Sequence, residues 1–119
     1  MSDWPRPVVL FQIQAKDLEK QKLFYSEMFD WDIEQIEGSP FLSIPAGKGP
    51  PENGIGGVLS PAEAPAMVMY IQVANLGESL EKSAALGGKV TLPSTDVPNG
   101  PTIAVIEDPE GNPVGLIQM

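Results

Sequence analysis

The chain has 119 residues, no cysteine, no histidine and a formal net charge of −9. Its length suits a single domain with a buried core, and 42% hydrophobic with 19% charged residues is typical of a globular protein. The acidic charge disfavours a nucleic-acid partner, no apolar run reaches the ~20 residues of a membrane helix, and the lack of cysteine fits a cytoplasmic protein.

The first predicted element is a strand over residues 7–14, which is rich in β-forming side chains. Alternation would put Val9, Phe11 and Ile13 on one face and Val8, Leu10, Gln12 and Gln14 on the other. Because the second face ends in two amides, we expect a polar group or a cavity on that side.

Asp17 is a good N-cap for a helix over residues 18–29. The helical spacing predicts one buried stripe along this helix, formed by Leu18, Tyr25, Met28 and Phe29 with Phe24 beside them. Glu19, Lys20 and Lys22 would point outward. Further strands are predicted at residues 30–36, 41–45 and 54–59. The turn-rich segment 46–53 is predicted to be an exposed loop.

After a proline-containing linker at 61–66, the same order of elements starts again. A strand is predicted over 67–73, then a helix over 76–86 capped by Asn75. A stripe of Leu76, Leu80 and Ala84 would be buried. A short strand at 89–93 and a final hairpin from Thr102 complete the chain, and Gly111 or Asn112 can take the positive φ that the hairpin turn needs.

The two halves can be superimposed in sequence. Asp17-Leu18 falls on Asn75-Leu76 with a shift of 58, and residues 53–56 fall on 112–115 with a shift of 59. We therefore predict an α+β fold in one domain, 1–119. Two βαβββ modules, at about 7–60 and 67–119, would form a curved mixed sheet around a concave cavity, with the helices outside.

Three motifs carry a resemblance to a known family. They are Asp17-Leu18, the run Phe24-Tyr25 to Asp30-Trp31, and Glu107 to Asn112 in the last hairpin. In this order, they resemble the vicinal-oxygen-chelate superfamily, which includes glyoxalase I, extradiol dioxygenases and bleomycin-resistance proteins. The resemblance implies paired βαβββ modules and, because two chains commonly complete the sites, a homodimer.

The metal-binding members of that family place ligands on strands of both modules. The corresponding positions here are Leu10, Gly56, Val68 and Gly115. None of these offers a side-chain donor, whereas a divalent ion needs three or more ligands held together. A register slip would bring Gln12 inward, but a lone amide does not bind a metal usefully. We therefore expect no metal and no cofactor.

Without a metal, the concave face would be an apolar surface with a few amides and one phenol, as in many small-molecule pockets. The predicted ligand-binding residues are Leu10, Gln12, Gly56, Val68, Tyr70, Gln72, Gly115 and Ile117. The alternative is that these side chains fill a barrel or a dimer seam. Gln12 and Gln72 weigh against it, because buried amides need hydrogen-bond partners.

Other polar and aromatic candidates are weaker. Tyr25 and Trp31 could stack on a ligand, but aromatic residues beside an amphipathic helix usually belong to the core. Glu107, Asp108 and Glu110 could suggest acid/base carboxylates. They surround a turn, however, and exposed carboxylates keep ordinary pKa values. Without histidine, no serine can belong to a histidine-activated triad.

The sequence thus favours a metal-independent small-molecule-binding protein of the glyoxalase/bleomycin-resistance superfamily. It would sequester a cationic or aromatic compound, and the net negative charge would attract a cationic one. The alternatives are a glyoxalase-type lyase, isomerase or dioxygenase with unusual site residues, and a structural or regulatory dimer with a closed hollow.

Overall fold

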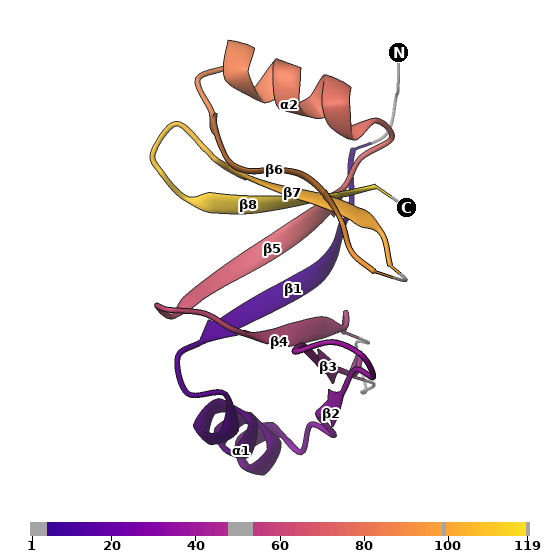
Figure 1. Cartoon of the computed structure of the whole chain (residues 1–119), viewed down its shortest axis with the longest axis vertical. Coiled ribbons are helices and arrows are strands. Elements are labelled where there is room, and N and C mark those ends of the chain that lie inside the picture. Colours follow the sequence, from indigo (N-terminus) through magenta and orange to yellow (C-terminus); the bar gives the residue numbers. More distant parts are fainter. Residues whose placement is uncertain (1–4, 48–53, 99, 119) are drawn as a thin grey trace. The chain divides into compact units, whose positions relative to one another are not determined.

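A computed structural model describes residues 5–47, 54–98 and 100–118. Its helices and strands follow the predicted order (Figure 1). They are β1 (Val8–Ala15), α1 (Leu18–Phe29), β2 (Glu34–Gln35), β3 (Leu42–Ile44), β4 (Gly57–Pro61), β5 (Ala66–Gln72), α2 (Leu76–Ala85), β6 (Lys89–Asp96), β7 (Thr102–Glu107) and β8 (Pro113–Gln118). This is the predicted α+β fold, with βαβββ twice. Neither helix of the described chain is long and apolar enough to cross a membrane.

Module 1 comprises β1 to β4 with α1, and module 2 comprises β5 to β8 with α2. In module 1 the strands lie in the order β2-β3-β4-β1, and in module 2 in the order β5-β8-β7-β6. The first strand of each module pairs in parallel with its last strand, and the other pairs are antiparallel. The chain divides into two compact units, one spanning Leu10–Val68 and the other formed by the chain on either side of it.

Both helices begin in the same way, which supports the internal repeat. The Asp17 carboxylate accepts a hydrogen bond from the Lys20 N–H at 3.1 Å, and the Asn75 amide oxygen accepts one from the Glu78 N–H at 2.9 Å. Each bond satisfies one of the unpaired N–H groups at a helix start. The second sequence match begins at residue 53, which lies outside the described residues.

Each module has its own core between its helix and one face of its sheet. In module 1 the buried residues are Ile13, Ala15, Ile33, Leu42, Ile44 and Leu59. In module 2 they are Leu76, Ala104 and Leu116, with Val73, Leu80 and Ile106 packed against them. The faces of β1 are therefore those that alternation predicts, with Ile13 towards the helix and Gln12 on the opposite face.

Several predicted boundaries were wrong. The strand expected over 30–36 is only Glu34–Gln35, because Asp30 and Trp31 are used to end α1 and to pack on its core. The strand expected from residue 54 begins at Gly57, and β6 continues to Asp96 instead of stopping at 93. Most of the loop predicted at 46–53 lies outside the described residues.

The predicted stripe of α1 is only half correct. Leu18 and Tyr25 pack against the core of module 1, but Phe24 is 54%, Met28 62% and Phe29 50% exposed. No residue of α1 is fully buried. Tyr25 and Trp31 stack with ring centroids 5.3 Å apart and 7° between the planes, and Trp31 also contacts Phe11. These rings therefore serve the core. On α2, Ala84 is exposed, so its predicted stripe ends at Leu80.

The end of α1 holds the one non-glycine residue with positive φ in the described chain. Asp30 has φ 60° and ψ 31°, and its N–H donates to the Ser26 carbonyl at 3.0 Å. Glycine is favoured at this left-handed position because it has no Cβ. A carboxylate at a helix C-terminus is also unfavourable for the helix dipole.

Replacing Asp30 should therefore stabilise the protein. Asp30→Gly should raise the free energy of unfolding by about 1 kcal/mol, because it removes both the Cβ and the charge. Asp30→Asn, which removes only the charge, should gain about 0.3–0.5 kcal/mol. Urea unfolding of the three proteins measures both values, and an Asp30→Gly protein less stable than the original would contradict this explanation.

Candidate functional site

In both modules, one face of the sheet carries the module's own helix and the other does not. We call the second the helix-free face. In module 1 it is formed by alternate residues of β1 and by their register partners on β4: Gln12 lies beside Val58, and Gln14 beside Ser60. Leu10 belongs to the same face, since it is two residues before Gln12 on the strand.

A chain of hydrogen bonds joins the polar groups of this face. Gln14 Nε2 donates to Gln12 Oε1 at 3.5 Å, and Gln12 Nε2 donates to Ser60 Oγ at 3.1 Å. Gln12 is 9% and Ser60 3% exposed. Burying an amide and a hydroxyl costs free energy unless they are paired, so this cluster fixes the positions of its donors and acceptors. The sequence had indicated the two amides but not the hydroxyl.

The helix-free face of module 2 is built in the same way. Leu116 belongs to the core under α2, and its register partner Ile71 shares its face. The residues on the opposite face are therefore Tyr70 beside Gly115 and Gln72 beside Ile117, with Val68 two residues before Tyr70. Ile103 and Val105 extend this face onto β7, since they pair with Ile117 and Gly115.

The Tyr70 ring lies directly on Gly115. A Cβ at residue 115 would be 2.5 Å from ring atoms Cδ2 and Cε2 of Tyr70, far inside contact distance. Burial raises the pKa of the Tyr70 phenol, so this group is neutral at physiological pH. A larger residue at position 115 would therefore displace the Tyr70 ring.

Gly56 has a different environment. It precedes β4, and a Cβ there would lie 3.2 Å from the Ile44 carbonyl oxygen and 3.5 Å from the Ala46 nitrogen. It thus allows close contact with the backbone that follows β3. The two glycines that correspond in sequence meet different neighbours, a backbone in module 1 and a ring in module 2.

The metal positions implied by the family resemblance do not fit an ion. Leu10 and Val68 have hydrocarbon side chains, and the Tyr70 ring occupies the space next to Gly115. In the part of the chain that is described, no three His, Cys, Asp or Glu side chains come together as a metal site.

The Asp108 carboxylate of the last hairpin has a structural role. Asp108 accepts hydrogen bonds from the Asn112 side chain at 2.9 Å and from the N–H groups of Asn112 and Glu110 at 2.9 and 3.0 Å. The Asn112 side chain and then the backbone N–H groups lower the pKa of the Asp108 carboxyl, so the ordinary pKa expected at this turn is wrong for Asp108. Gly111 takes the positive φ, 90°, as the turn pattern predicted.

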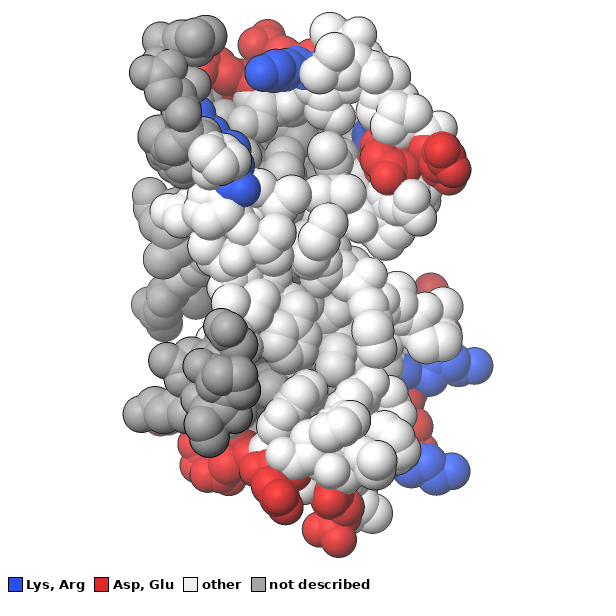
Figure 2. All heavy atoms as spheres, turned by 180° about the vertical axis from the view of Figure 1, so that it is seen from behind, with Lys and Arg blue, Asp and Glu red and all other residues white. Residues whose placement is uncertain are grey.

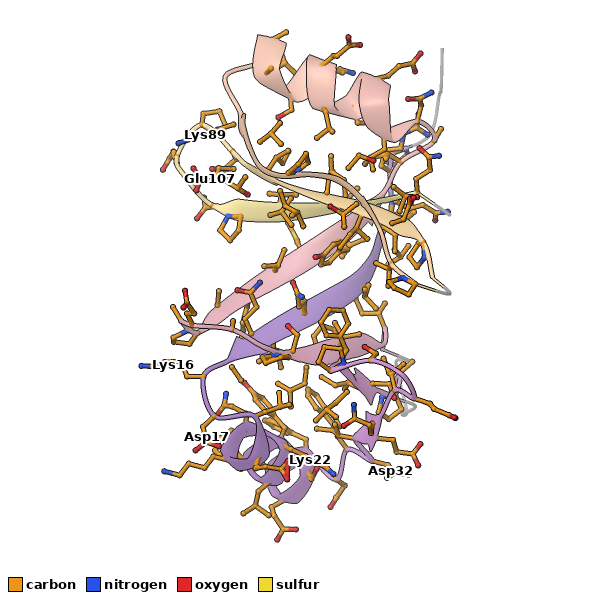
Figure 3. All side chains as sticks on the ribbon, viewed as in Figure 1. Lys16, Asp17, Lys22, Asp32, Lys89 and Glu107 are labelled. Atoms are coloured by element: carbon orange, nitrogen blue, oxygen red, sulfur yellow. The ribbon has the colours of Figure 1, made fainter. Side chains whose placement is uncertain are left out.

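Charged side chains also border the helix-free face of module 2. Glu107 follows Val105 by two residues on β7, and Lys89 of β6 lies opposite Glu107 in the strand register (Figure 3). Val68, Tyr70 and Ile117 of this face are buried, with 3–5% exposure, so the lysine and the glutamate lie at its edge. The sequence offers Glu107 as a weak acid/base candidate beside a turn, but it does not predict the lysine opposite it.

Comparison with known proteins identifies the family. Residues 9–117 match the family described as "Glyoxalase-like domain". The chain belongs to this family. No curated protein sequence matches it.

Solved structures with the same fold cover nearly all of this glyoxalase-like chain at low identity. An NAD-dependent benzaldehyde dehydrogenase from Legionella pneumophila is 19% identical, with a TM-score of 0.65 over 97% of this chain and 99% of that one. A glyoxalase/bleomycin resistance protein/dioxygenase superfamily member from Vibrio splendidus 12B01 is 15% identical, with 0.64 over 97% and 100%. A Streptomyces coelicolor methylmalonyl-CoA epimerase variant in complex with 2-nitronate-propionyl-CoA is 12% identical, with 0.65 over 93% and 95%. These likenesses show the fold.

The contact of Tyr70 with Gly115 can be tested by a double-mutant cycle. Gly115→Ala should lower the free energy of unfolding by about 1–3 kcal/mol, because the added methyl overlaps the ring. In a Tyr70→Ala background the same change should cost much less, since the ring is gone. Gly47→Ala is the control, because a Cβ there meets no atom within 4 Å. Equal costs of Gly115→Ala in both backgrounds would contradict the contact.

Proposed function

We propose that this glyoxalase-like protein binds a small organic molecule without a metal, and that it sequesters a cationic or aromatic compound. The observation that carries the proposal is the hydrogen bond of buried Gln12 to Ser60 on the helix-free face of module 1. Both side chains are buried, and a few fixed polar groups among apolar side chains are the usual composition of a small-molecule site.

The polar cluster supports recognition of a ligand with both donor and acceptor atoms. Gln14 is half-buried and carries an amide, and the Ser60 hydroxyl that accepts from Gln12 is itself a donor. Around the cluster lie Leu10 and Val58. Separately, the helix-free face of module 2 carries an aromatic ring, Tyr70, and apolar neighbours. Either face by itself suits an uncharged or cationic aromatic ligand better than a phosphate or other anion.

The net charge supports the cationic class. With 16 acidic and seven basic residues, the chain would attract a cation from a distance and repel anions. In its acidic charge the chain resembles the resistance-type members of the superfamily.

The proposed location is the cytoplasm, since a chain without cysteine does not depend on an oxidising compartment.

An enzymatic role has less support. Of the eight candidate ligand residues only Tyr70 titrates, and burial raises its pKa, so it is a poor base at neutral pH. The similarity to the epimerase structure shows only a shared fold. Gln12, Gln14 and Ser60 can bind and orient a ligand, but none of them can remove a proton from carbon unaided.

A thermal-shift screen in the presence of EDTA tests the proposal. Suitable probes are bleomycin, crystal violet and benzamidine as cationic aromatic compounds, with benzoate as the anionic counterpart. A ligand at 100 times its Kd should add about 2.7 kcal/mol, which corresponds to roughly 10 °C in Tm. We expect cationic aromatic probes to raise Tm and benzoate to leave it unchanged.

Variants then locate the site. Gln12→Leu and Ser60→Ala should each weaken binding of an active probe by about tenfold, the effect of one lost hydrogen bond. Gln35→Leu makes the same amide-to-hydrocarbon change on the exposed strand β2 and should leave the affinity unchanged. An affinity that is the same in all three variants would place the ligand elsewhere.

A further inference from the structure

The helix-free face of module 1 extends beyond Gln12 across the whole sheet of that module. Four residues, one from each strand, follow one another as register partners in a single row: Gln12 on β1, Val58 on β4, Ser43 on β3 and Glu34 on β2. Register partners point to the same side of a sheet. The polar cluster at Gln12 and the carboxylate of Glu34 therefore lie at opposite ends of one row.

The burial of the neighbouring residues agrees with this placement. Leu42 and Ile44 are buried in the core of module 1, so Ser43 between them points to the other face. Ile33, directly before β2, is buried in the same core, and Glu34 follows it on the opposite side. Ser43 is half-buried and Glu34 is exposed, so a ligand can reach both side chains.

An aromatic ring lies beside this pair. Phe41 is two residues before Ser43 in the chain and therefore shares its face. It is half-buried, yet it is not among the described residues that pack against the core of module 1. Its N–H donates to the Ser39 hydroxyl at 3.0 Å, and its carbonyl accepts from the Ile36 N–H at 3.0 Å. The backbone of Phe41 is thus held in place, although the core does not use the ring.

The charge around Glu34 has one sign. The segment 23–47, which contains β2 and β3, has no lysine or arginine and five acidic residues, namely Glu27, Asp30, Asp32, Glu34 and Glu37. Glu34 therefore has no cation on its own hairpin. On the surface formed by module 1, carboxylate atoms gather at the lower end, and most of them lie apart from the lysine atoms (Figure 2). This field attracts a cationic group to the outer end of the row.

We propose that Glu34, Ser43 and Phe41 form a subsite for the cationic end of the ligand, and that the ligand is an aromatic amidine or guanidine. The inference rests on the proposed function, because the subsite belongs to the same face as Gln12. The Cβ atoms of facing residues on paired strands are about 5 Å apart. A planar amidinium can therefore donate to the Glu34 carboxylate and to the Ser43 hydroxyl oxygen together, with its ring over Phe41.

The length of the row determines the shape of this ligand. Three strand spacings of about 4.8 Å separate Gln12 from Glu34, which is about 14 Å between their Cα atoms. A benzene ring that carries the amidinium at one end and a hydrogen-bonding group at the opposite end matches this length once each end makes a hydrogen bond. The subsite thus selects for charge, and the cluster of Gln12 and Ser60 selects for the group at the other end.

Three para-substituted probes of nearly equal size test the subsite. The cation is para-aminobenzamidine, the neutral amide is para-aminobenzamide and the anion is para-aminobenzoate. NMR titration of the full chain measures their affinities. We expect the cation to bind about three- to fivefold more tightly than the amide, which is the effect of one exposed ion pair. The anion should bind most weakly, because the carboxylates around Glu34 repel it.

Variants of the subsite separate charge from packing. Glu34→Gln should lower the affinity for the cation to that for the amide and leave the affinity for the amide unchanged. Phe41→Leu should weaken the binding of both by about threefold, since a stacked ring pair is lost. At about 1 M salt, where the Debye length is about 3 Å, the advantage of the cation should diminish. A purely structural effect of Glu34→Gln would not depend on the charge of the probe.

Two matched controls lie in the same module. Glu37→Gln removes the same charge from the neighbouring turn, and Phe24→Leu makes the same ring-to-aliphatic change at an exposed position of α1. Both should leave the affinities close to those of the unmodified chain. Equal affinities of the cation and the amide, or a Glu34→Gln protein that binds the cation as tightly as the unmodified chain does, would overturn the subsite.

The same variants distinguish a failure of the subsite from a failure of the proposed function. If Gln12→Leu weakens binding of the cation but Glu34→Gln does not, the proposed function stands and the subsite is wrong. If no cationic probe binds, the proposed function fails and the subsite fails with it.

Discussion

The register of the first and last strands in each module determines the rest of the structure. Phe11 lies beside Gly57 in module 1, and Tyr70 lies beside Gly115 in module 2. In parallel strands register partners share a face, so these pairs decide which side chains meet the helix and which do not. A slip by one residue would move Ile13 away from the core and Gln12 into it. The slipped register is unfavourable, because it would bury the Gln12 amide under α1 without a hydrogen-bond partner.

Because register partners share a face, an aromatic ring lies over its partner residue, and both pairs contain glycine. A Cβ at Gly57 would lie 2.7 Å from Cε2 of the Phe11 ring, and a Cβ at Gly115 would lie 2.5 Å from the Tyr70 ring. In module 1 the aromatic residue faces the helix, whereas in module 2 it faces away from it. The two modules therefore share their topology, but Gly57 makes room for a ring on the helix side of the sheet and Gly115 for a ring on the helix-free face. The ring on Gly115 also occupies a position where the family resemblance would place a metal ligand.

Features set by local chemistry could be predicted from the sequence. The N-caps at Asp17 and Asn75, the bounds of α1 and the positive φ of Gly111 follow from the conformational preferences of a few neighbouring residues. The alternation of β1 also gave the correct face for Gln12. Features set by tertiary contacts could not be predicted. Trp31 joins the aromatic cluster instead of a strand, and the exposure of Met28 depends on which side of α1 the sheet covers.

The candidate site was predicted in part for the same reason. Its residues on β1 and β5 follow from strand alternation alone. Ser60 was missed because its hydroxyl becomes relevant only when β4 pairs with β1 and brings it within 3.1 Å of Gln12. The position of the Tyr70 ring likewise depends on the pairing of β5 with β8. Both contacts join residues more than 40 positions apart in the chain. Sequence periodicity predicts the faces of an element but not which distant residues pair.

The central claim is that the helix-free face of module 1 holds an organic molecule and not a metal ion. Equilibrium dialysis of the purified chain against Mg²⁺, Mn²⁺, Fe²⁺, Co²⁺, Ni²⁺ and Zn²⁺, followed by elemental analysis, tests it most directly. The account predicts that less than about 0.1 equivalent of any ion remains per chain, because the site positions lack donors. One equivalent of a divalent ion per chain, lost in the Gln12→Leu variant, would contradict it.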